Sequence, residues 1–358
     1  GIFLSLGLKG FTLTYIAVAF KQLFSKEEDS SSGEISSFQS LTTALSATVG
    51  TGNIAGVATA IFVGGPGAIF WMWVSAVFGM ATKFAEAFLA IKYREKNELG
   101  ETIGGPMYYI KNGLTSKFIV FAYLFATAGM IAALGIGNGV QVNSVSQVIN
   151  NEFGFSTFSI GIVIAILVAL VILGGIKSIG NITSKLVPVM SLVYILGGLL
   201  IIILNANQVG YVFNLIVTSA FTTTAATGGF AGATVWMALR YGVARGVFSN
   251  EAGLGSSPIA HAAAKTNNPV KQGMISMLEP LIDTLIVCTI TAFVILMSNQ
   301  WVGEINGAVL TVASFENLLA NGKYIVIFGL ILFSFSTIIG WSYYGEKCVE
   351  FLFGSGVI

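Results

Sequence analysis

Four consecutive residues, Gly50-Thr51-Gly52-Asn53, interrupt an otherwise apolar stretch that runs from Leu45 to Ile61. Glycine, threonine and asparagine there favour a break in a helix over its continuation. A broken helix exposes amide N–H groups that attract a carboxylate, and carbonyl groups that attract a cation. The alternative is close helix packing, but packing through small residues favours a spacing of four, and Gly50 and Gly52 are two apart. The residue types therefore indicate binding of an anionic group and a cation.

The composition places this break inside a membrane protein. Hydrophobic residues make up 55% of the 358 residues and charged residues 9%, whereas soluble domains carry roughly a quarter charged residues. The two cysteines, Cys288 and Cys348, form no disulfide framework, and no Cys/His spacing suggests a metal site. The net charge of +1 argues against a nucleic-acid partner. The sequence predicts an all-α integral membrane protein surrounded by lipid, because backbone groups cannot face lipid unpaired.

Helical spans are predicted wherever an apolar stretch can cross a hydrocarbon core of about 30 Å. These stretches cover about 38–64, 67–92, 117–149, 156–175, 186–204, 218–240, 272–298 and 324–346. Residues 1–24 are broken at Lys9-Gly10 and are expected to hold the end of an N-terminal span and an interfacial helix. A polar linker follows at 25–37.

Lysine and arginine set the predicted orientation, because basic loops stay in the cytoplasm. The linker 25–37 and the loop 93–116 are basic and are predicted to be cytoplasmic, so the span 38–64 starts inside. The same rule places residues 245–266 on the cytoplasmic side of the membrane, where they could form a re-entrant segment. The alternative is that these residues are the broken part of a longer span.

A second interruption, Thr227-Gly228-Gly229, lies in the middle of the span predicted at 218–240. The two interrupted spans have opposite predicted directions. Such a pair is typical of transporters built from inverted repeats, in which the breaks meet near the middle of the membrane.

Several long motifs resemble the alanine or glycine:cation symporter family. They are GTGNIAGVATAI, GGPGAIFWMW, GGPMYYI, LGGIKSIG, RGVFSNEAGLGSSPIAHAAAKT and STIIGWSYYGEK. The resemblance covers nearly the whole chain and implies the leucine-transporter architecture of two inverted five-helix repeats with two broken helices. It assigns residues 1–37 to the N-terminal segment and linker, 38–204 to the first repeat and 205–358 to an incomplete second repeat. By this comparison the chain is expected to be a fragment that lacks the first helix and the last two core helices.

The resemblance also implies a role for individual residues. Amides of Gly50, Thr51 and Gly52 would hold a substrate carboxylate, and carbonyls of Thr227, Gly228 and Gly229 its ammonium group. All-oxygen ligands suit sodium, a hard cation. The expected sodium ligands are the Thr48 carbonyl with the Asn53 side chain at one site, and at another the carbonyls of Ser46 and Val49 with the hydroxyls of Ser336 and Thr337. The alternative for these two hydroxyls is hydrogen bonding to carbonyls of their own helix.

Trp341 is expected to close the substrate pocket. It lies four residues after Thr337 and therefore shares a helix face with it. If Thr337 faces the central site, the indole lies beside the substrate side chain and limits it to a small group. The alternative is an ordinary packing or interface tryptophan.

Charged residues within the spans are functional candidates by default. Asp283 is deep in its span and is interpreted as either structural, with Lys83 as partner, or proton-linked; it is left outside the site. Lys83 and Glu86 are three residues apart and are expected to satisfy each other. His261 is expected to be a satisfied surface or interface histidine near the cytoplasmic face.

The predicted function is sodium-coupled symport of small neutral amino acids, alanine and glycine, by alternating access across the cell membrane. No cofactor is expected beyond the coupling ion. One alternative is a proton-coupled carrier that uses Asp283 or Glu251, and a more distant one is an ion channel. An enzyme is not expected, because no catalytic residues are grouped. Asn138 or Gln141 either lines the cavity or packs between helices.

Overall fold

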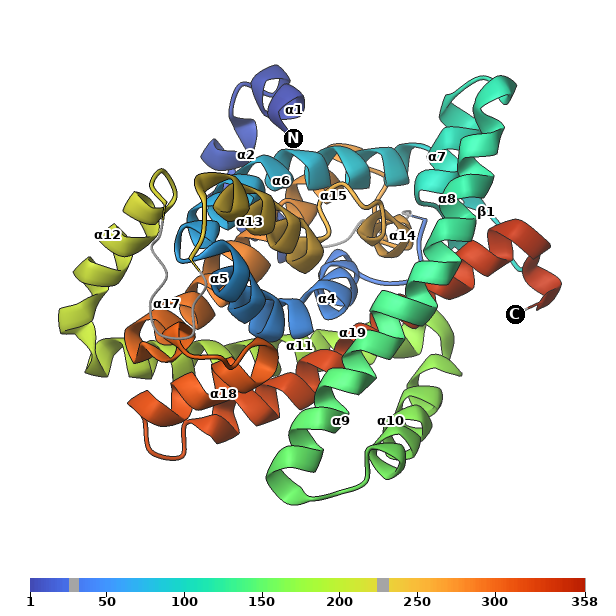
Figure 1. Cartoon of the computed structure of the whole chain (residues 1–358). Helices are drawn as coiled ribbons and strands as arrows, with labels where there is room; N and C mark the ends of the chain where they lie inside the picture. The colour runs from blue at the N-terminus through green and yellow to red at the C-terminus, as the bar shows by residue number, and fades with distance from the viewer. Residues whose placement is uncertain (26–31, 224–231, 358) are drawn as a thin grey trace.

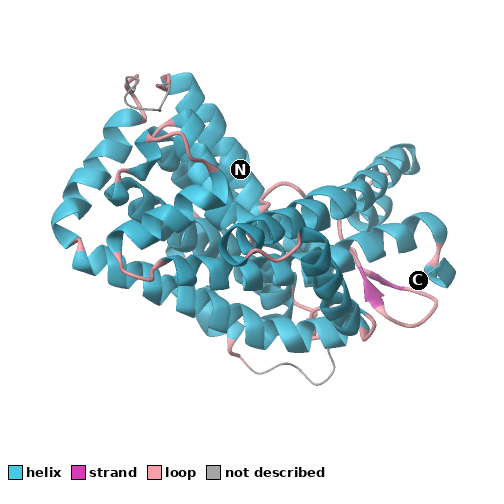
Figure 2. Ribbon diagram, turned by 60° about the horizontal axis from the view of Figure 1, so that its bottom comes forward, coloured by secondary structure: helices cyan, strands magenta, loops and turns pink. Residues whose placement is uncertain are grey.

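The computed structural model describes residues 1–25, 32–223 and 232–357, and most of them are helical (Figures 1 and 2). The first part contains α1 (Ile2–Gly7), α2 (Phe11–Thr14), α3 (Ile16–Leu23), α4 (Ser37–Thr48), the π-helix η1 (Gly52–Gly56), α5 (Val57–Gly64), α6 (Gly67–Lys92), α7 (Pro106–Gly113), η2 (Ser116–Phe118), α8 (Ile119–Ala132), the π-helix η3 (Ala133–Gly139), α9 (Val140–Phe153) and α10 (Thr157–Ile172). The second part contains α11 (Gly175–Leu204), η4 (Ala206–Gln208), α12 (Val209–Ser219), α13 (Val235–Asn250), α14 (Ser257–Ala262), α15 (Pro269–Ser276), α16 (Leu278–Pro280), the π-helix η5 (Leu281–Cys288), α17 (Thr289–Ser298), η6 (Gln300–Val302), α18 (Gly307–Leu318), α19 (Lys323–Phe353) and η7 (Ser355–Val357). A small antiparallel hairpin of β1 (Glu95–Lys96) and β2 (Thr102–Ile103) lies in the loop after α6.

Long apolar helices confirm a multi-pass membrane protein. Five continuous helical stretches in the described residues are long and apolar enough to cross a bilayer, and a sixth candidate is a bent pair. The five are 67–92, 116–153, 175–204, 269–298 and 323–353. The bent pair is Ser37–Thr48 with Gly52–Gly64, whose two halves differ in direction by 52°. The break predicted in the span 38–64 is therefore present.

Three boundaries differ from the prediction. The helix predicted to begin at 186 begins at Gly175, because Lys177 and Lys185 lie on its exposed side and do not interrupt it. The predicted loops 205–217 and 299–322 contain α12 and α18, which are short and partly apolar helices.

The single span predicted over 218–240 is wrong. Helix α12 ends at Ser219, and α13 begins at Val235 and continues past Arg240 and Arg245 to Asn250. The stretch is apolar across both helix ends, so apolarity gave no signal for where either helix stops. The second predicted break, Thr227-Gly228-Gly229, lies outside the described residues.

Helix α4 lies near the centre of the molecule, between α11, α14 and α19 (Figure 1). It begins at a capping box, in which the Ser36 hydroxyl accepts from Gln39 N (3.0 Å) and the Gln39 side chain accepts from Ser36 N (2.9 Å). Nearly all its residues are buried, including its serines and threonines. Their hydroxyls mostly bond to carbonyls of the same helix, as that of Ser46 does with Thr43 O (2.7 Å). Such a polar helix is stable at the centre because its hydroxyls are satisfied within it.

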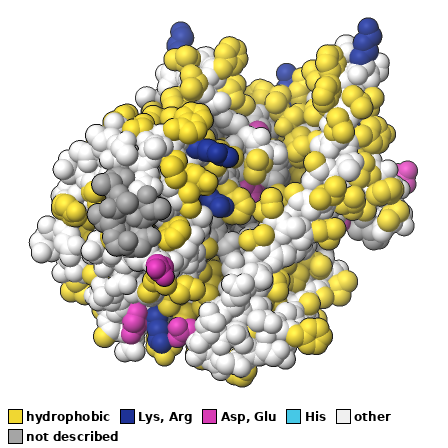
Figure 3. All heavy atoms as spheres, in the orientation of Figure 1, with side chains coloured by type: hydrophobic (Ala, Val, Ile, Leu, Met, Phe, Trp, Pro, Cys, Tyr) yellow, Lys and Arg dark blue, Asp and Glu magenta, His cyan; other side chains and the backbone are white. Residues whose placement is uncertain are grey.

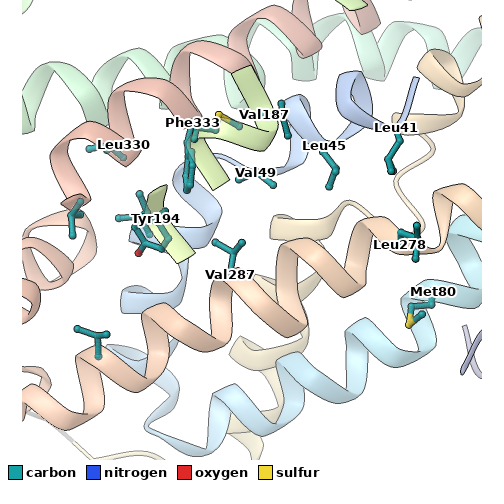
Figure 4. Close-up of a cluster of buried hydrophobic side chains, with 14 of the residues drawn as sticks. Leu41, Leu45, Val49, Met80, Val187, Tyr194, Leu278, Val287, Leu330 and Phe333 are labelled. Carbon is teal, nitrogen blue, oxygen red and sulfur yellow. The ribbon is translucent and has the colours of Figure 1, made fainter. Parts of the chain in front are cut away.

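Apolar side chains pack around the end of α4. Val49 belongs to the same cluster as Val187 and Tyr194 of α11, Val287 of η5 and Phe333 of α19 (Figure 4). This cluster connects the break to α11, η5 and α19. It fixes the position of the broken helix relative to the helices that face it.

Hydrophobic side chains also cover much of the visible surface, with charged groups scattered among them (Figure 3). Exposed large hydrophobic residues are frequent on α8, α10 and α11. Side chains of this kind face lipid in membrane proteins.

Candidate functional site

The candidate site is built around the break between α4 and η1. Val49 leaves the helix with an extended backbone (φ −74°, ψ 91°), and the chain resumes as a π-helix at Gly52. A Cβ atom on Gly50 would come closer than 3.0 Å to Thr337 Oγ1 and would lie 3.2 Å from Gln141 Oε1. Only glycine therefore allows α19 and α9 to approach the break this closely.

Two amides of the break are bonded to side chains rather than to helix carbonyls. Gly50 N donates to Asn53 Oδ1 (2.9 Å), and Thr51 N donates to Gln141 Oε1 (3.2 Å). The hydroxyl of Thr51 is buried and has no hydrogen-bond partner among the described residues. The oxygen of Gln141 occupies a position in which an external carboxylate oxygen would meet the same amide. Of Asn138 and Gln141, the two residues that the sequence left open, Gln141 contacts the break, whereas Asn138 donates to the Ala133 carbonyl within η3.

Asp283 contacts the predicted cation ligand Asn53. Asn53 Nδ2 donates to Asp283 Oδ1 (2.7 Å) and also to the Asp283 carbonyl (3.1 Å). The other carboxylate oxygen accepts from Ser249 (2.7 Å) and from Thr284 (2.7 Å). Within the described part of the chain, no lysine, arginine or histidine lies within ion-pair distance of Asp283, including the partner considered from the sequence, Lys83. A buried carboxylate with only neutral donors is well placed to favour a cation nearby.

Of the two predicted ligands on α19, only Thr337 contacts the break. Thr337 Oγ1 is 3.4 Å from the Val49 carbonyl and donates to Phe333 O at 2.9 Å. Ser336 donates to the same Phe333 carbonyl (2.9 Å) and contacts the sulfur of Met190 (3.5 Å). Thr337 is therefore placed against the break, whereas the Ser336 hydroxyl points toward α11.

Two further predicted ligands belong to the last turns of α4. The Thr48 hydroxyl bonds to the carbonyls of Ala44 and Leu45, which leaves the predicted ligand, its own carbonyl, at the helix end. Ser46 faces α19 at Gly340, where an added Cβ would lie 2.9 Å from its hydroxyl. Both residues are within the last turn before the break, where carbonyls have no helix partner.

Trp341 is held between two elements. An added Cβ on Gly137 of η3 would overlap the indole side chain, so the tryptophan packs directly on the bare backbone there. On the other side, Trp341 Nε1 donates to Glu251 Oε1 (2.8 Å). Sequence reasoning considered Glu251 only as a proton-coupling group, because nothing in the local sequence connects it to a tryptophan 90 residues away.

A buried ionic cluster lies on α6, α14 and α16, apart from the break. Lys83 forms an ion pair with Glu279 (2.8 Å) and donates to Ser257 (2.8 Å). Glu86 accepts from Gly255 N (3.2 Å), so the predicted Lys83–Glu86 pairing is wrong: tertiary contacts supply both partners. His261 is hydrogen-bonded, as predicted, with Nε2 2.6 Å from Glu279 Oε1, but it is completely buried, so a surface position is wrong.

The geometry suits binding, with no grouping that resembles a catalytic centre in the described residues. Backbone amides, an unpaired hydroxyl and a carboxylate surround one break, and Trp341 lies one helical turn from Thr337. Such a site can hold a small molecule with a carboxylate together with a cation.

Comparison with known proteins identifies the family of the chain. A family model described as the sodium:alanine symporter family matches residues 1–358. The chain is 51% identical to the sodium/alanine symporter AgcS of Methanococcus maripaludis, over 99% of this chain and 79% of that protein. It is 37% identical to the amino-acid carrier protein AlsT of Bacillus subtilis, over 98% of this chain and 74% of that protein. A Bacillus subtilis protein named "Probable sodium/glutamine symporter GlnT" is 39% identical over 98% of this chain and 73% of its own length.

Proposed function

Because the chain belongs to the sodium:alanine symporter family and is a transporter rather than an enzyme, we propose that it couples uptake of small neutral amino acids to sodium. Alanine and glycine are the proposed substrates. The observation that carries this proposal is the break itself, where the amides of Gly50 and Thr51 and the unpaired Thr51 hydroxyl lie beside Gln141. A carboxylate of the substrate would replace the oxygen of Gln141 on the Thr51 amide.

The coupling cation would bind on the opposite side of the same break. Asp283, whose carboxylate accepts from Asn53 Nδ2, provides oxygen atoms there, and the Val49 carbonyl with Thr337 provides a second group. Sodium at the first position would compensate the buried charge of Asp283. Since the break joins both positions, a cation that orders it also orders the amides that hold the substrate. Sodium and amino acid would then each raise the affinity for the other by the same factor.

Transport would follow alternating access. The protein would lie in the cell membrane with the linker 25–37 and the loop 93–116 on the cytoplasmic side. The sidedness is supported by the basic residues of these segments. Two inverted repeats would carry the two breaks, and the end of α19 that bears Lys347 would then face the cytoplasm.

The test is uptake of labelled alanine into proteoliposomes that contain the purified protein. We expect uptake to require an inward sodium gradient, to saturate, and to show counterflow, in which unlabelled alanine inside accelerates entry. Uptake that does not saturate and lacks counterflow would indicate a channel and contradict the proposal.

Proton coupling is the second candidate, because Asp283 is buried without an ion-pair partner among the described residues. The same vesicles distinguish the two ions. If an inward proton gradient drives uptake in sodium-free buffer, and sodium adds nothing, the coupling ion is the proton and the sodium proposal fails.

A further inference from the structure

The tryptophan of the candidate site is positioned by a carboxylate whose role the proposed function does not explain. Trp341 is on α19, one turn beyond Thr337, and only 6% of its surface is exposed. Helix α19 packs along α8 and η3, and η3 contacts it at the tryptophan through Gly137 (Figure 1). The indole N–H has one acceptor here, the Oε1 atom of Glu251.

Glu251 is itself held in a defined orientation. It follows the last residue of α13 and adopts a left-handed backbone (φ 57°), which is uncommon for a residue other than glycine. Its second carboxylate oxygen accepts a hydrogen bond from the Ser256 hydroxyl. Backbone and hydroxyl together fix the carboxylate, so that the remaining oxygen points at the indole. Backbone strain of this kind concentrates at functional sites.

A cavity lies beside the indole. It measures about 230 Å³, and its walls include Phe248, Glu251, Ile259, Trp341 and Cys348. Cys348 is further along α19 than Trp341, whereas Thr337 and the break lie in the opposite direction. The indole therefore lies between Thr337 and Cys348 along α19 and lines a cavity large enough for several water molecules, each of which takes about 30 Å³.

We propose that Glu251 is a positioning residue for transport: its carboxylate holds the Trp341 indole as the wall between the substrate position and this cavity, and thereby sets the largest substrate side chain. The proposal rests on the proposed function and deepens it. With the hydrogen bond intact, the indole is pinned between Gly137 and Glu251, and a substrate beside it would be limited to a small side chain. Without it, the indole can turn into the cavity, and a larger side chain can enter the space it leaves.

The indole must also leave this position for a substrate to reach the cavity. By the proposed sidedness, the cavity is on the cytoplasmic side of the site. Glu251 would therefore limit release as well as selectivity. An acceptor is needed for this role, but a charge is not, so glutamine at position 251 can replace glutamate.

The test compares Glu251→Gln, which keeps an acceptor oxygen, with Glu251→Met, which has similar length and lacks it. We expect Glu251→Met to lower the leucine concentration that half-inhibits alanine uptake by about tenfold or more, the usual effect of losing a hydrogen bond to a charged group. Glu251→Gln should retain most of the exclusion of leucine. Ser342→Ala, next to the tryptophan on α19, is the matched control, because the Ser342 hydroxyl bonds only to Ile338 O and should not affect leucine.

A double-mutant cycle with Trp341→Phe, which removes the indole N–H, shows whether the effect passes through the indole. In the Trp341→Phe background, Glu251→Met should cause no further change in leucine inhibition. A full additional effect there would overturn the proposal. So would a Glu251→Met variant that inserts normally, transports alanine and excludes leucine as well as the parent does.

A readout without transport separates this proposal from the proposed function. Labelling with 5-fluorotryptophan gives one ¹⁹F signal for each of the five tryptophans, and Trp341→Phe identifies the signal of Trp341. That signal should shift in Glu251→Met but keep its position in Ser342→Ala. An unchanged signal would overturn the positioning role. A shifted signal in a protein whose parent shows no sodium-driven uptake would leave the contact established and refute the proposed function alone.

Discussion

Helix α19 lies so close to the break that only glycine fits at position 50, and Gly50→Ala tests this requirement. The new Cβ would lie closer than 3.0 Å to Thr337 Oγ1, a separation that real Cβ atoms essentially never show, and 3.2 Å from Gln141 Oε1. Thr337 cannot easily turn away, because its branched side chain has few allowed rotamers in a helix and its hydroxyl bonds Phe333 O. Either the hydroxyl rotates and loses that bond, at about 1 kcal/mol, or the helices move apart.

Overpacking of this kind costs about 1–3 kcal/mol in well-packed interiors. A displacement of the break by the same free energy would weaken alanine binding by about tenfold to a hundredfold. We therefore expect Gly50→Ala to insert in the membrane, to lose thermal stability, and to need a much higher alanine concentration for half-maximal sodium-driven uptake. The assays are a melting curve of the detergent-solubilised protein and an alanine titration in proteoliposomes.

Gly56→Ala is the matched control, because it adds the same methyl group to the same broken span. Its nearest contact would be Thr51 O at 3.9 Å, an ordinary van der Waals distance. Combining Gly50→Ala with Thr337→Ala removes the clashing oxygen and should restore the melting temperature, but not sodium activation if Thr337 is a ligand. Parental stability and uptake in Gly50→Ala would refute the argument that the break must be approached closely.

Three further changes test separate contacts. Asn53→Ala removes the donor to Asp283 and should shift sodium activation to higher concentration by about tenfold, measured as the sodium dependence of alanine uptake. Trp341→Val should admit leucine and weaken alanine uptake, measured by competition of unlabelled leucine against labelled alanine. Lys83→Met removes the lysine that pairs with the buried Glu279, leaves only His261 and Ser276 in contact with that carboxylate among the described residues, and should lower stability by about 3–5 kcal/mol, measured as loss of folded protein on heating.

Each of these expectations has a result that contradicts it. A parental sodium curve in a normally inserted Asn53→Ala variant would remove Asn53 from the cation site. Continued exclusion of leucine by a Trp341→Val variant that transports alanine would remove the indole from the pocket. For the ion pair, the double variant Lys83→Met/Glu279→Met should be more stable than Lys83→Met alone, and equal instability would show that the charge of Glu279 is not the cause.

The broken span illustrates what local composition reveals. Glycine and asparagine at positions 50, 52 and 53 are poor helix formers, so the interruption was predictable without knowledge of any neighbour, and the structure confirms it. The ends of other helices could not be predicted as well from the sequence. The predicted span 218–240 failed because apolarity marks membrane depth and does not mark where a helix stops.

The sequence by itself determined that this is an all-α membrane protein with an interrupted span, and its motifs indicated the family. Only the tertiary structure decided which side chains meet at the break. Gln141 reaches Thr51 from 90 positions away, and Asp283 reaches Asn53 from 230 positions away. Helices that are apolar on all sides carry little periodic signal about which face turns inward. Rotation and crossing of the packed helices therefore fix these pairs, and they also place Glu251 on the indole of Trp341.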